Sequence, residues 1–396
     1  MISVLPMAFH PKLQGFQTDS VIAQLPPTVQ VYVVGGAVRD PLMGRTSSDR
    51  DWVVVGATVD NMLAAGFTPV GADFPVFLHP VSKEEYALAR TERKSGHGYK
   101  GFTFHADPSV TLEEDLARRD FTVNAMAMSA TGALVDPFNG VQDLQNKLMR
   151  HVSSAFTEDP LRVLRLARFL ARFLDFSVAE ETMALCGELR NSGELKHLVA
   201  ERVYAELHKG MGEEKPSRML KLIGKLNAWG ELAPSCQVPF SGFDKPEYDR
   251  LNGLRNAEDR WVYSLGFFLN PAQIKSLAKA WRLPRDTEDL AVVASISHAF
   301  AQQAHFDAAA TGQFFNRVDV FRKPARLQQV NRLIQHLLGD SPLSQCVDHA
   351  VAEVEQGHYK AFLGDKIANA QAGEPVAQVA VKARQAWVNA LHSRFF

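Results

Sequence analysis

Residues 31–40 read Val-Tyr-Val-Val-Gly-Gly-Ala-Val-Arg-Asp, an apolar run followed by a glycine pair and a charged segment. The β-branched run is typical of a buried strand, and the glycine pair permits a tight turn into a helix. Backbone N–H groups at such a helix start, together with Arg39, are donors for a polyphosphate that comes close to Gly36. The stretch therefore predicts a strand, a turn and a phosphate-binding helix start. The alternative is an ordinary strand-to-helix turn, because neither GxGxxG nor GK[ST] spacing is present.

A pair of carboxylates follows nine residues beyond Asp40, where Asp49-Arg50-Asp51 leads into the apolar run 52–55. Residues i and i+2 of a strand face the same side, so both carboxylates are expected to project together while Arg50 points away. Oxygen ligands on one face suit Mg²⁺, and two such ions can activate a hydroxyl and hold a leaving pyrophosphate. Asp49 and Asp51 are therefore the predicted catalytic and metal-binding residues. The alternative is a solvated turn at a strand entrance.

The fold class predicted for the chain is α+β. Short β-branched and aromatic runs indicate strands at 31–34, 52–55, 76–78, 85–90 and 133–135, and helices are expected at 61–65 and 112–117. From Thr157 onward the apolar spacing is helical, apart from Pro and Gly breaks near 230–246. We therefore expect an N-terminal α/β head with a small mixed sheet, followed by an all-α part. The expected divisions are an extension 1–28, a head 29–152, a helical neck 153–232 and a helical body and tail 233–396.

The composition excludes several classes of protein. The chain has 396 residues, 46% of them hydrophobic, with 43 Lys and Arg against 44 Asp and Glu. A disordered tail is excluded, and so is a general nucleic-acid coat protein, so that any nucleic-acid site must be local. Three widely spaced cysteines do not form a disulfide framework, and no run of 18 apolar residues occurs. We expect a cytoplasmic protein without a membrane partner.

The segment 157–174 predicts an amphipathic helix with Thr157 as N-cap and Pro160 in the first turn. At about 100° per residue its apolar side chains form one stripe and its four arginines another. Four arginines with no lysine favour planar recognition of phosphate or base, although a solvated stripe is the alternative. The arginines are Arg162, Arg165, Arg168 and Arg172.

Three motifs resemble, in order and spacing, those of the class II tRNA nucleotidyltransferase and poly(A) polymerase family. They are Gly35-Gly36-Ala-Val-Arg39-Asp40 with Asp49 and Asp51, Arg118-Arg119-Asp120-Phe-Thr-Val-Asn124, and Glu158-Asp159-Pro-Leu-Arg162-Val-Leu-Arg165-Leu-Ala-Arg168-Phe169. Residues 74–93 are similar to the bacterial CCA-adding branch of that family. The strong resemblance covers about residues 31–207.

The resemblance implies template-independent addition of C, C and A to the tRNA 3′ end from CTP and ATP, with Mg²⁺ as cofactor. Asp49 and Asp51 would hold the metal, and Asp120 and Asn124 would contact the ribose. The implied nucleotide-binding residues are Gly36, Arg39, Arg119, Asp159, Arg162, Arg165 and Arg168. Two alternatives stay open: residues 118–120 as a surface ion-pair cluster, and Glu85 as either a third carboxylate or an exposed strand glutamate.

Asp159 and Arg162 would select the base in place of a template. A carboxylate accepts from the exocyclic amine of cytosine or adenine, and a guanidinium donates to the ring acceptor beside it. Uracil and guanine present a carbonyl oxygen and a ring N–H at those places, so both contacts reject them. The glycine-rich stretch 91–101 is expected to be a mobile loop, which in relatives that add all three nucleotides is associated with the switch from C to A. A simple surface loop is the alternative.

The second half departs from many bacterial relatives, which carry a metal-dependent phosphohydrolase domain with a His-Asp pair. Here the corresponding residues 260–268 read Arg-Trp-Val-Tyr-Ser-Leu-Gly-Phe-Phe, so we predict that phosphohydrolase activity is missing. Basic residues at 215–225 and 322–332 are expected to track the acceptor and T arms of tRNA, with solvated faces as the alternative. A monomer is favoured.

Other functions compatible with the motifs are a partial enzyme that adds only A or only CC, a poly(A) polymerase and a non-enzymatic RNA-binding protein. A dinucleotide-dependent oxidoreductase is disfavoured, because the glycine pair lacks the third glycine of the fingerprint and no βαβ repeat follows.

Overall fold

The computed structural model describes residues 3–4, 19–46, 50–70, 76–94, 102–105, 107–236, 246–303, 307–371 and 373–396. The chain forms two compact units, Met1–Val199 and Ala200–Phe396, here called unit 1 and unit 2. Their boundary falls inside the stretch 153–232 that is predicted as a neck, and the boundaries at 28, 152 and 232 stay predictions. Among the described residues, none of the helices has the length and apolar character needed to cross a membrane.

Unit 1 is built on a mixed sheet with the strand order β1-β10-β9-β2-β3-β6-β5-β4. Neighbouring strands are antiparallel except for β3 and β6, which are parallel. Five of these strands confirm the predicted ones, and β1, β4 and β9 were not predicted. The strands are β1 (Ser3–Val4), β2 (Gln30–Val34), β3 (Asp51–Val55), β4 (Thr68–Val70), β5 (Val76–Leu78), β6 (Glu85–Leu88), β9 (Ala127–Ser129) and β10 (Ala133–Val135).

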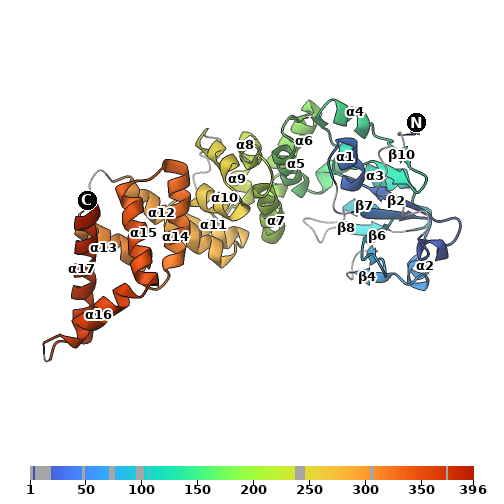
Figure 1. Ribbon diagram of the computed structural model, residues 1–396. Helices are drawn as coiled ribbons and strands as arrows, with labels where there is room; N and C mark the ends of the chain where they lie inside the picture. Colours follow the sequence, from blue (N-terminus) through green and yellow to red (C-terminus); the bar gives the residue numbers. More distant parts are fainter. Residues whose placement is uncertain are drawn as a thin grey trace. The chain divides into compact units, whose positions relative to one another are not determined.

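The two faces of this sheet carry separate apolar cores, because side chains alternate along each strand. Val33 and Trp52 face a core that includes side chains of α1 (Gly36–Leu42), α2 (Val59–Ala64) and α4 (Gly140–Gln145). Val34 and Val53 face the other core, together with Leu116 of α3 (Leu112–Ala117). Figure 1 labels these helices and several strands of the sheet. The helices α2 and α3 confirm the two that the sequence predicts. The same alternation places Asp51 on the face of Val53.

Residues 19–28 contribute to unit 1 and are not merely an extension. Val21 and Leu25 are buried in the first core, beside the 3₁₀ helix η3 (Ile22–Gln24). An oxygen of Asp19 accepts a hydrogen bond from the Val21 N–H at 2.8 Å and lies 3.3 Å from the ring of His79. The first structured strand is β1, which pairs with β10, and not the strand at residues 30–34. Two buried residues in a short turn are too few to produce a periodic sequence signal.

The stretch 91–101 begins as a strand, which corrects the prediction of a loop. β7 (Thr91–Lys94) pairs antiparallel with β8 (Phe102–His105), and residues 95–101 lie outside the described residues. Glycines after Lys94 dominate the composition of the stretch and conceal its strand-forming start. The remaining elements of unit 1 are η5 (Thr122–Asn124), β11 (Leu148–Met149), η6 (Ser154–Glu158), α5 (Leu161–Arg172), β12 (Ser177–Val178), α6 (Glu180–Asn191) and η7 (Glu194–His197).

The arginine helix α5 begins later than predicted, because Thr157 is not its N-cap. Thr157 belongs to the 3₁₀ helix η6, and Pro160 is the residue that precedes the first turn of α5. Asp159 has an extended backbone, with φ −113° and ψ 102°. The ring of a proline disfavours helical geometry in the residue before it, so Asp159 separates the two helices.

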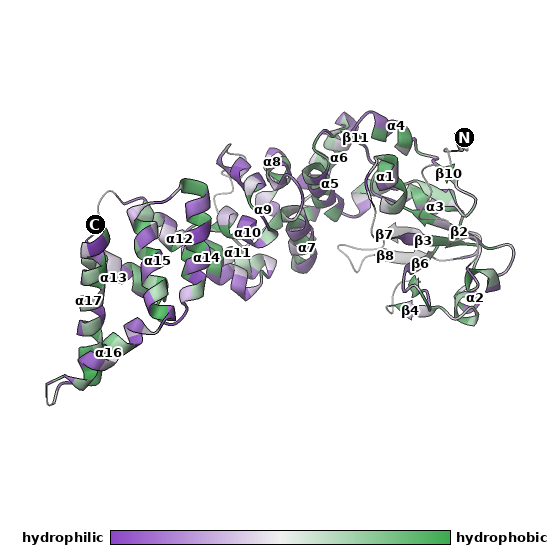
Figure 2. Ribbon diagram, viewed as in Figure 1, coloured by the Kyte–Doolittle hydropathy of each residue, from purple (hydrophilic) through white to green (hydrophobic). Residues whose placement is uncertain are grey.

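Every described element of unit 2 is a helix, as the sequence predicts. Hydrophobic and hydrophilic residues both occur along these helices (Figure 2). α10 packs against α12 at Gly266, where an added Cβ would lie 2.5 Å from the Cβ of Ala294. The helices are α7 (Ala200–Met211), α8 (Pro216–Lys225), α9 (Trp229–Leu232), η9 (Pro246–Gly253), α10 (Ala257–Gly266), α11 (Pro271–Trp281), α12 (Arg285–Ala301), α13 (Ala308–Arg317), α14 (Pro324–Leu338), α15 (Pro342–Glu355), α16 (His358–Ala368) and α17 (Val376–Phe395).

Candidate active site

Three strand ends meet beside the glycine turn. Asp51, the first residue of β3, pairs in register with Val34, the last residue of β2, and with Glu85, the first residue of β6. Gly35 follows Val34 directly, so the carboxylate at position 51 lies between the glycine turn and the carboxylate at position 85. Residues paired across neighbouring strands share a face of the sheet, and adjacent strands are about 5 Å apart. Asp51 and Glu85 are both exposed and form an oxygen-rich edge.

Arg50 points away from that edge, as the strand alternation predicts. Its Nε donates to a carboxylate oxygen of Glu84 at 2.6 Å, and its guanidinium lies 5.5 Å from the centre of the Trp52 ring. Trp52 belongs to the core on the opposite face from Val53. Asp49 lies outside the described residues, so the predicted alignment of Asp49 with Asp51 stays a prediction.

The two glycines of the turn lie against guanidinium groups. Gly35 has φ +67°, a conformation that L side chains rarely adopt, and a Cβ there would lie 3.5 Å from Nη1 of Arg119. A Cβ on Gly36 would lie 3.4 Å from Nη2 of Arg39. A side chain at either position would therefore cover an arginine that borders the turn.

Arg119 forms an ion pair with the buried carboxylate of Asp115. Asp115 of α3 has no exposed side-chain surface, and it pairs with Arg118 at 2.7 Å and with Arg119 at 3.3 Å. Burial would raise the pKa of Asp115, but the two arginines outweigh burial and lower it. These contacts are the i,i+3 and i,i+4 pairs of a helix end. Arg118 and Arg119 therefore pair with the buried Asp115 and not with Asp120 in a surface cluster, and Nη1 of Arg119 lies beside Gly35.

A chain of polar side chains, buried except for the half-buried Arg165, links α5 to α1. Arg165 of α5 pairs with Asp120 at 2.7 Å, and Asp120 accepts a hydrogen bond from the side-chain amide of Asn124 at 2.9 Å. The amide oxygen of Asn124 in turn accepts from Nη1 of Arg39. Burial alone would raise the pKa of Asp120, but Arg165, Asn124 and Arg162 together lower it to about 2. Four predicted site residues are therefore part of one network.

Arg39 is more deeply buried than a phosphate ligand on an open surface would be, since only 3% of it is exposed. Its Nη2 pairs with Asp40 at 2.7 Å, and Arg172 pairs with the second oxygen of Asp40 at the same distance. The guanidinium also lies 5.2 Å from the ring of Phe169 and 5.1 Å from that of Phe173. Arg39 thus fastens the helix start of α1 to α5.

The arginines of α5 differ in how deeply they are buried. Arg162 is buried, and its two Nη atoms donate to the backbone carbonyls of Ala155 and Arg118. Arg165 and Arg168 are half-buried, and the guanidinium of Arg168 lies 4.6 Å from the centre of the Phe169 ring. Arg162 therefore differs from Arg165 and Arg168 in its burial, and the expectation of one shared binding face stays a prediction. Burial of the first turn of α5 beneath the 118–120 motif is a tertiary effect, which helical spacing alone does not reveal.

Asp159 lies half-buried at the start of α5, where one carboxylate oxygen accepts from the backbone N–H of Leu161 at 3.1 Å. Sequence reasoning missed the roles of Asp115, Asp40 and the phenyl ring of Phe173. Only Asp115 had a usable signal, its spacing of three and four residues from two arginines.

Comparison with known proteins gives the family. Residues 31–150 match the model of the poly A polymerase head domain, and residues 175–237 match a probable RNA and SrmB-binding site of polymerase A. The CCA-adding enzyme of Pseudomonas entomophila is 42% identical, over 91% of this chain and 99% of its own length. The chain belongs to the bacterial CCA-adding enzyme family. The multifunctional CCA protein of Dechloromonas aromatica is 48% identical, over 76% of this chain and 82% of its own.

Solved CCA-adding enzymes share the fold. The Bacillus stearothermophilus CCA-adding enzyme in complex with CTP has a TM-score of 0.65 at 23% identity, covering 98% of this chain and 94% of that one. The Thermotoga maritima CCA-adding enzyme complexed with tRNA has a TM-score of 0.60 at 20% identity, covering 93% of both chains. The poly A polymerase head match contains the glycine turn, Asp51 and the 118–124 motif. Helix α5 falls between the two matched stretches of this CCA-adding family member.

Proposed function

We propose that this chain is a tRNA nucleotidyltransferase that adds C, C and A to the tRNA 3′ end from CTP and ATP and releases pyrophosphate. The observation that carries the proposal is the register of β2, β3 and β6, which sets Asp51 beside the Gly35 turn and Glu85 beside Asp51. Membership of the CCA-adding family supports the choice of tRNA, CTP and ATP as substrates.

The carboxylates at the strand edge fit Mg²⁺, because hard oxygen ligands on one face suit this ion. Asp51 and Asp49 would hold the ion, and Glu85 is a candidate third carboxylate. When bound, Mg²⁺ supplies charge that makes the terminal hydroxyl a better nucleophile and stabilises the leaving pyrophosphate. The chain's own part in this step would be to hold Asp51 and Glu85 at the starts of two paired strands, where carboxylates placed in advance lower the cost of reorganisation.

The glycine turn and its arginines would bind the triphosphate. Arg119 reaches the turn at Gly35, and the missing Cβ at Gly36 lets Nη2 of Arg39 lie close to the backbone there. Arg39 is placed under Gly36 and would act there as a fixed positive charge, held by Asp40 and Asn124. Preorganised charge of this kind is the main way in which a protein stabilises phosphoryl-type transfer.

Asp159 and Arg162 would select the base, Arg165 and Arg168 would contact the nucleotide, and Asp120 and Asn124 would contact the ribose. Both Nη atoms of Arg162 already donate to backbone carbonyls. A base contact at either atom therefore requires that one of these hydrogen bonds be exchanged. Such an exchange would move Arg162 between two partner sets during selection of C or A.

The proposal is tested by incorporation of labelled CTP and ATP onto tRNA transcripts that end at the discriminator base, at C, and at CC. UTP and GTP serve as controls, and the 3′ ends are sequenced. We expect CCA to be added and synthesis to stop. Asp51→Ala abolishes incorporation, whereas Asp60→Ala, a change of an exposed acid in α2, leaves it intact.

Other products would revise the proposal in defined ways. An A added only to the CC-ended transcript would indicate a partial enzyme, and long A tails would indicate a poly(A) polymerase. Binding of tRNA without any incorporation would favour a non-enzymatic RNA-binding protein. Contacts to the acceptor and T arms, a monomeric state and a cytoplasmic location remain predictions from the sequence.

A further inference from the structure

Two consecutive glutamates, Glu84 and Glu85, lie on opposite faces of the sheet edge in unit 1. Glu85 is the first residue of β6 and pairs in register with Asp51. Side chains alternate along an extended chain, so Glu84 belongs to the other face. There its two carboxylate oxygens accept hydrogen bonds, one from Nε of Arg50 at 2.6 Å and one from Nε1 of Trp52 at 3.1 Å. Glu84 therefore binds both chain neighbours of Asp51 from the face opposite to that carboxylate.

The register of the sheet begins one residue after Arg50. Asp51 is the first residue of β3, and it pairs with Val34 on one side and with Glu85 on the other. The ion pair with Glu84 fixes the residue that enters the strand. The side chains of Arg50 and Glu84 are only 33% and 21% exposed, so water screens this pair less than it screens a pair on an open surface.

Trp52 gives this arrangement a rigid base in the core. Its side chain is buried, and its ring stacks on that of Tyr86, with 5.3 Å between the ring centres and 8° between the planes. The guanidinium of Arg50 lies on the same indole, 5.5 Å from the centre of the ring. Through Glu84, the residue before Asp51 is thus joined to a buried aromatic pair.

The backbone of Glu84 is fixed by the turn between β5 and β6. The N–H of His79 donates to the carbonyl of Glu84 at 3.0 Å, and the N–H of Lys83 donates to the carbonyl of His79 at 3.0 Å. The buried ring of His79 accepts from the N–H of Ser82 at 3.1 Å. A side chain on a fixed backbone loses less conformational entropy when it binds its partners, so the turn favours the contacts that Glu84 makes.

We propose that Glu84 is a positioning residue for the metal-binding carboxylate of Asp51. By holding Arg50 and Trp52, Glu84 sets the backbone torsions of the residue between them, and so the direction in which Asp51 projects beside Glu85. A metal site requires ligands held to within about 0.5 Å, and groups that orient the ligands change metal affinity by about 10–100-fold. The inference rests on the proposed function, in which Asp51 holds Mg²⁺.

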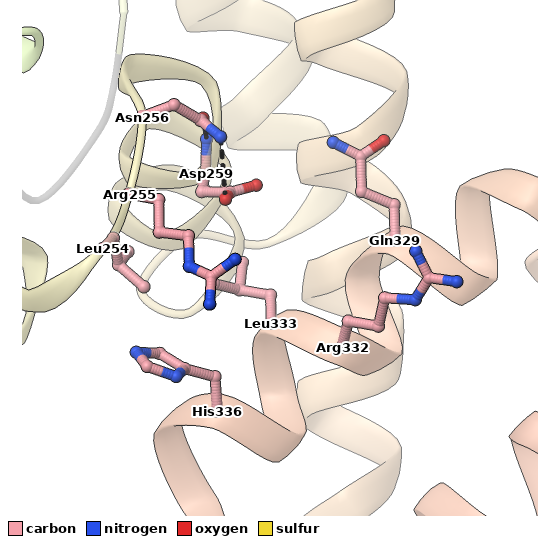
Figure 3. Close-up of a pocket in the computed structure, with 8 residues that line it drawn as sticks. All are labelled: Leu254, Arg255, Asn256, Asp259, Gln329, Arg332, Leu333 and His336. Carbon is pink, nitrogen blue, oxygen red and sulfur yellow. Dashed lines mark hydrogen bonds between the residues drawn. The ribbon is translucent and has the colours of Figure 1, made fainter.

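The test compares full-length wild type with Glu84→Gln, whose amide oxygen accepts from one donor while its NH₂ group faces the other. Asp259→Asn is the matched control. Asp259 is a half-buried carboxylate that lines a cavity of unit 2 and accepts from the side chain of Asn256 at 3.1 Å (Figure 3). Arg50→Gln removes the same ion pair from its other side, and Asp51→Ala removes the ligand.

Two properties of each protein are measured. Mn²⁺ is titrated into the protein without nucleotide or tRNA, and the free ion is counted by electron paramagnetic resonance. Incorporation of CTP into tRNA is then followed over a range of Mg²⁺ concentrations. Thermal unfolding in the absence of metal shows whether each variant is folded.

We expect Glu84→Gln to bind Mn²⁺ about tenfold more weakly and to need about tenfold more Mg²⁺ for half-maximal incorporation. Saturating Mg²⁺ restores the rate to within about twofold, because the ligands are still present. Arg50→Gln has the same effect, and the double variant with Glu84→Gln is no weaker than either single variant, since both remove one interaction. A merely structural role would instead lower the rate at every Mg²⁺ concentration and leave the Mn²⁺ affinity of the folded protein unchanged.

Three results would overturn the proposal. The first is a Glu84→Gln protein that matches Asp259→Asn in both measurements. The second is the loss of a bound ion from Glu84→Gln at saturating Mn²⁺, because Glu84 would then be a ligand itself. The third is an Asp51→Ala protein that binds Mn²⁺ as the wild type does, because Glu84 would then have no ligand to position. Failure of the proposed function is seen separately, as absent incorporation by the wild type.

Discussion

At the scale of single residues, the candidate site depends on buried charges that neutralise one another. Asp120 is 7% exposed and is ionised because Arg165 lies 2.7 Å from it and Asn124 donates to it. Its pKa falls from 3.8 to about 2, although burial acts in the opposite direction. The carboxylate therefore keeps its negative charge, and its ion pair with Arg165, at every pH well above 2.

This pKa leads to a prediction about acid stability. Because the pKa of Asp120 is lower in the folded chain than in the unfolded chain, its contribution to stability is present above about pH 4 and is lost as the pH falls toward 2. The shift corresponds to about 2 kcal/mol. Between about pH 5 and pH 2, we expect the wild type to lose about 2 kcal/mol more unfolding free energy than Asp120→Asn. Urea unfolding at each pH measures the difference, and equal losses would contradict the assignment.

At the scale of elements, α10 and α12 approach so closely that one backbone position tolerates no side chain. A Cβ at Gly266 would lie 2.5 Å from the Cβ of Ala294 and 2.9 Å from the carbonyl oxygen of Ala291. We expect Gly266→Ala to lower the free energy of unfolding by about 1–3 kcal/mol, because overpacking forces the helices apart. Denaturant titration is the measurement.

A matched helical glycine gives the control for this prediction. Gly364 of α16 has nothing within 4 Å of its added Cβ. Gly364→Ala should raise stability by about 0.5–1 kcal/mol, since alanine is the better helix former. Opposite signs for the two substitutions support the close approach of α10 and α12, and a stabilising Gly266→Ala would exclude it.

The elements also show how far a sequence can be interpreted before the structure is known. Local patterns were sufficient for β2, β3 and the glycine turn, because β-branched runs and glycines determine those elements. They failed at Pro160, where the effect of the proline on Asp159 outweighed a plausible N-cap at Thr157. They also gave no sign that Arg162 is buried, because it donates to the carbonyls of Ala155 and Arg118, which no spacing rule brings close.

At the scale of the whole molecule, the packing of α10 in unit 2 is consistent with the predicted loss of phosphohydrolase activity. Residues 260–268 lie in and just after α10, and the close packing at Gly266 leaves no space for a metal-ligating side chain at that position.

We expect the pure full-length protein to release no product from cyclic nucleotides in the presence of Ni²⁺ or Mg²⁺. Chromatography of the reaction mixtures measures this, with incorporation of CTP into tRNA by the same preparation as proof that the protein is active. Metal-dependent hydrolysis that persists through purification and is retained by Asp51→Ala would contradict the prediction.

The parallel pairing of β3 and β6 has a consequence for the order of folding. An antiparallel pair can be joined by a short hairpin, but a parallel pair cannot. Along the chain, α2, β4 and β5 lie between β3 and β6, so a long loop must close before these two strands pair. Closing a loop of that length costs chain entropy before any contact rewards it, so this pairing is expected to form after the β2–β3 and β5–β6 pairings, whose connections are shorter. Asp51 and Glu85 come together through that pairing, and a partly folded unit 1 therefore has sheet structure but no site for a nucleotide.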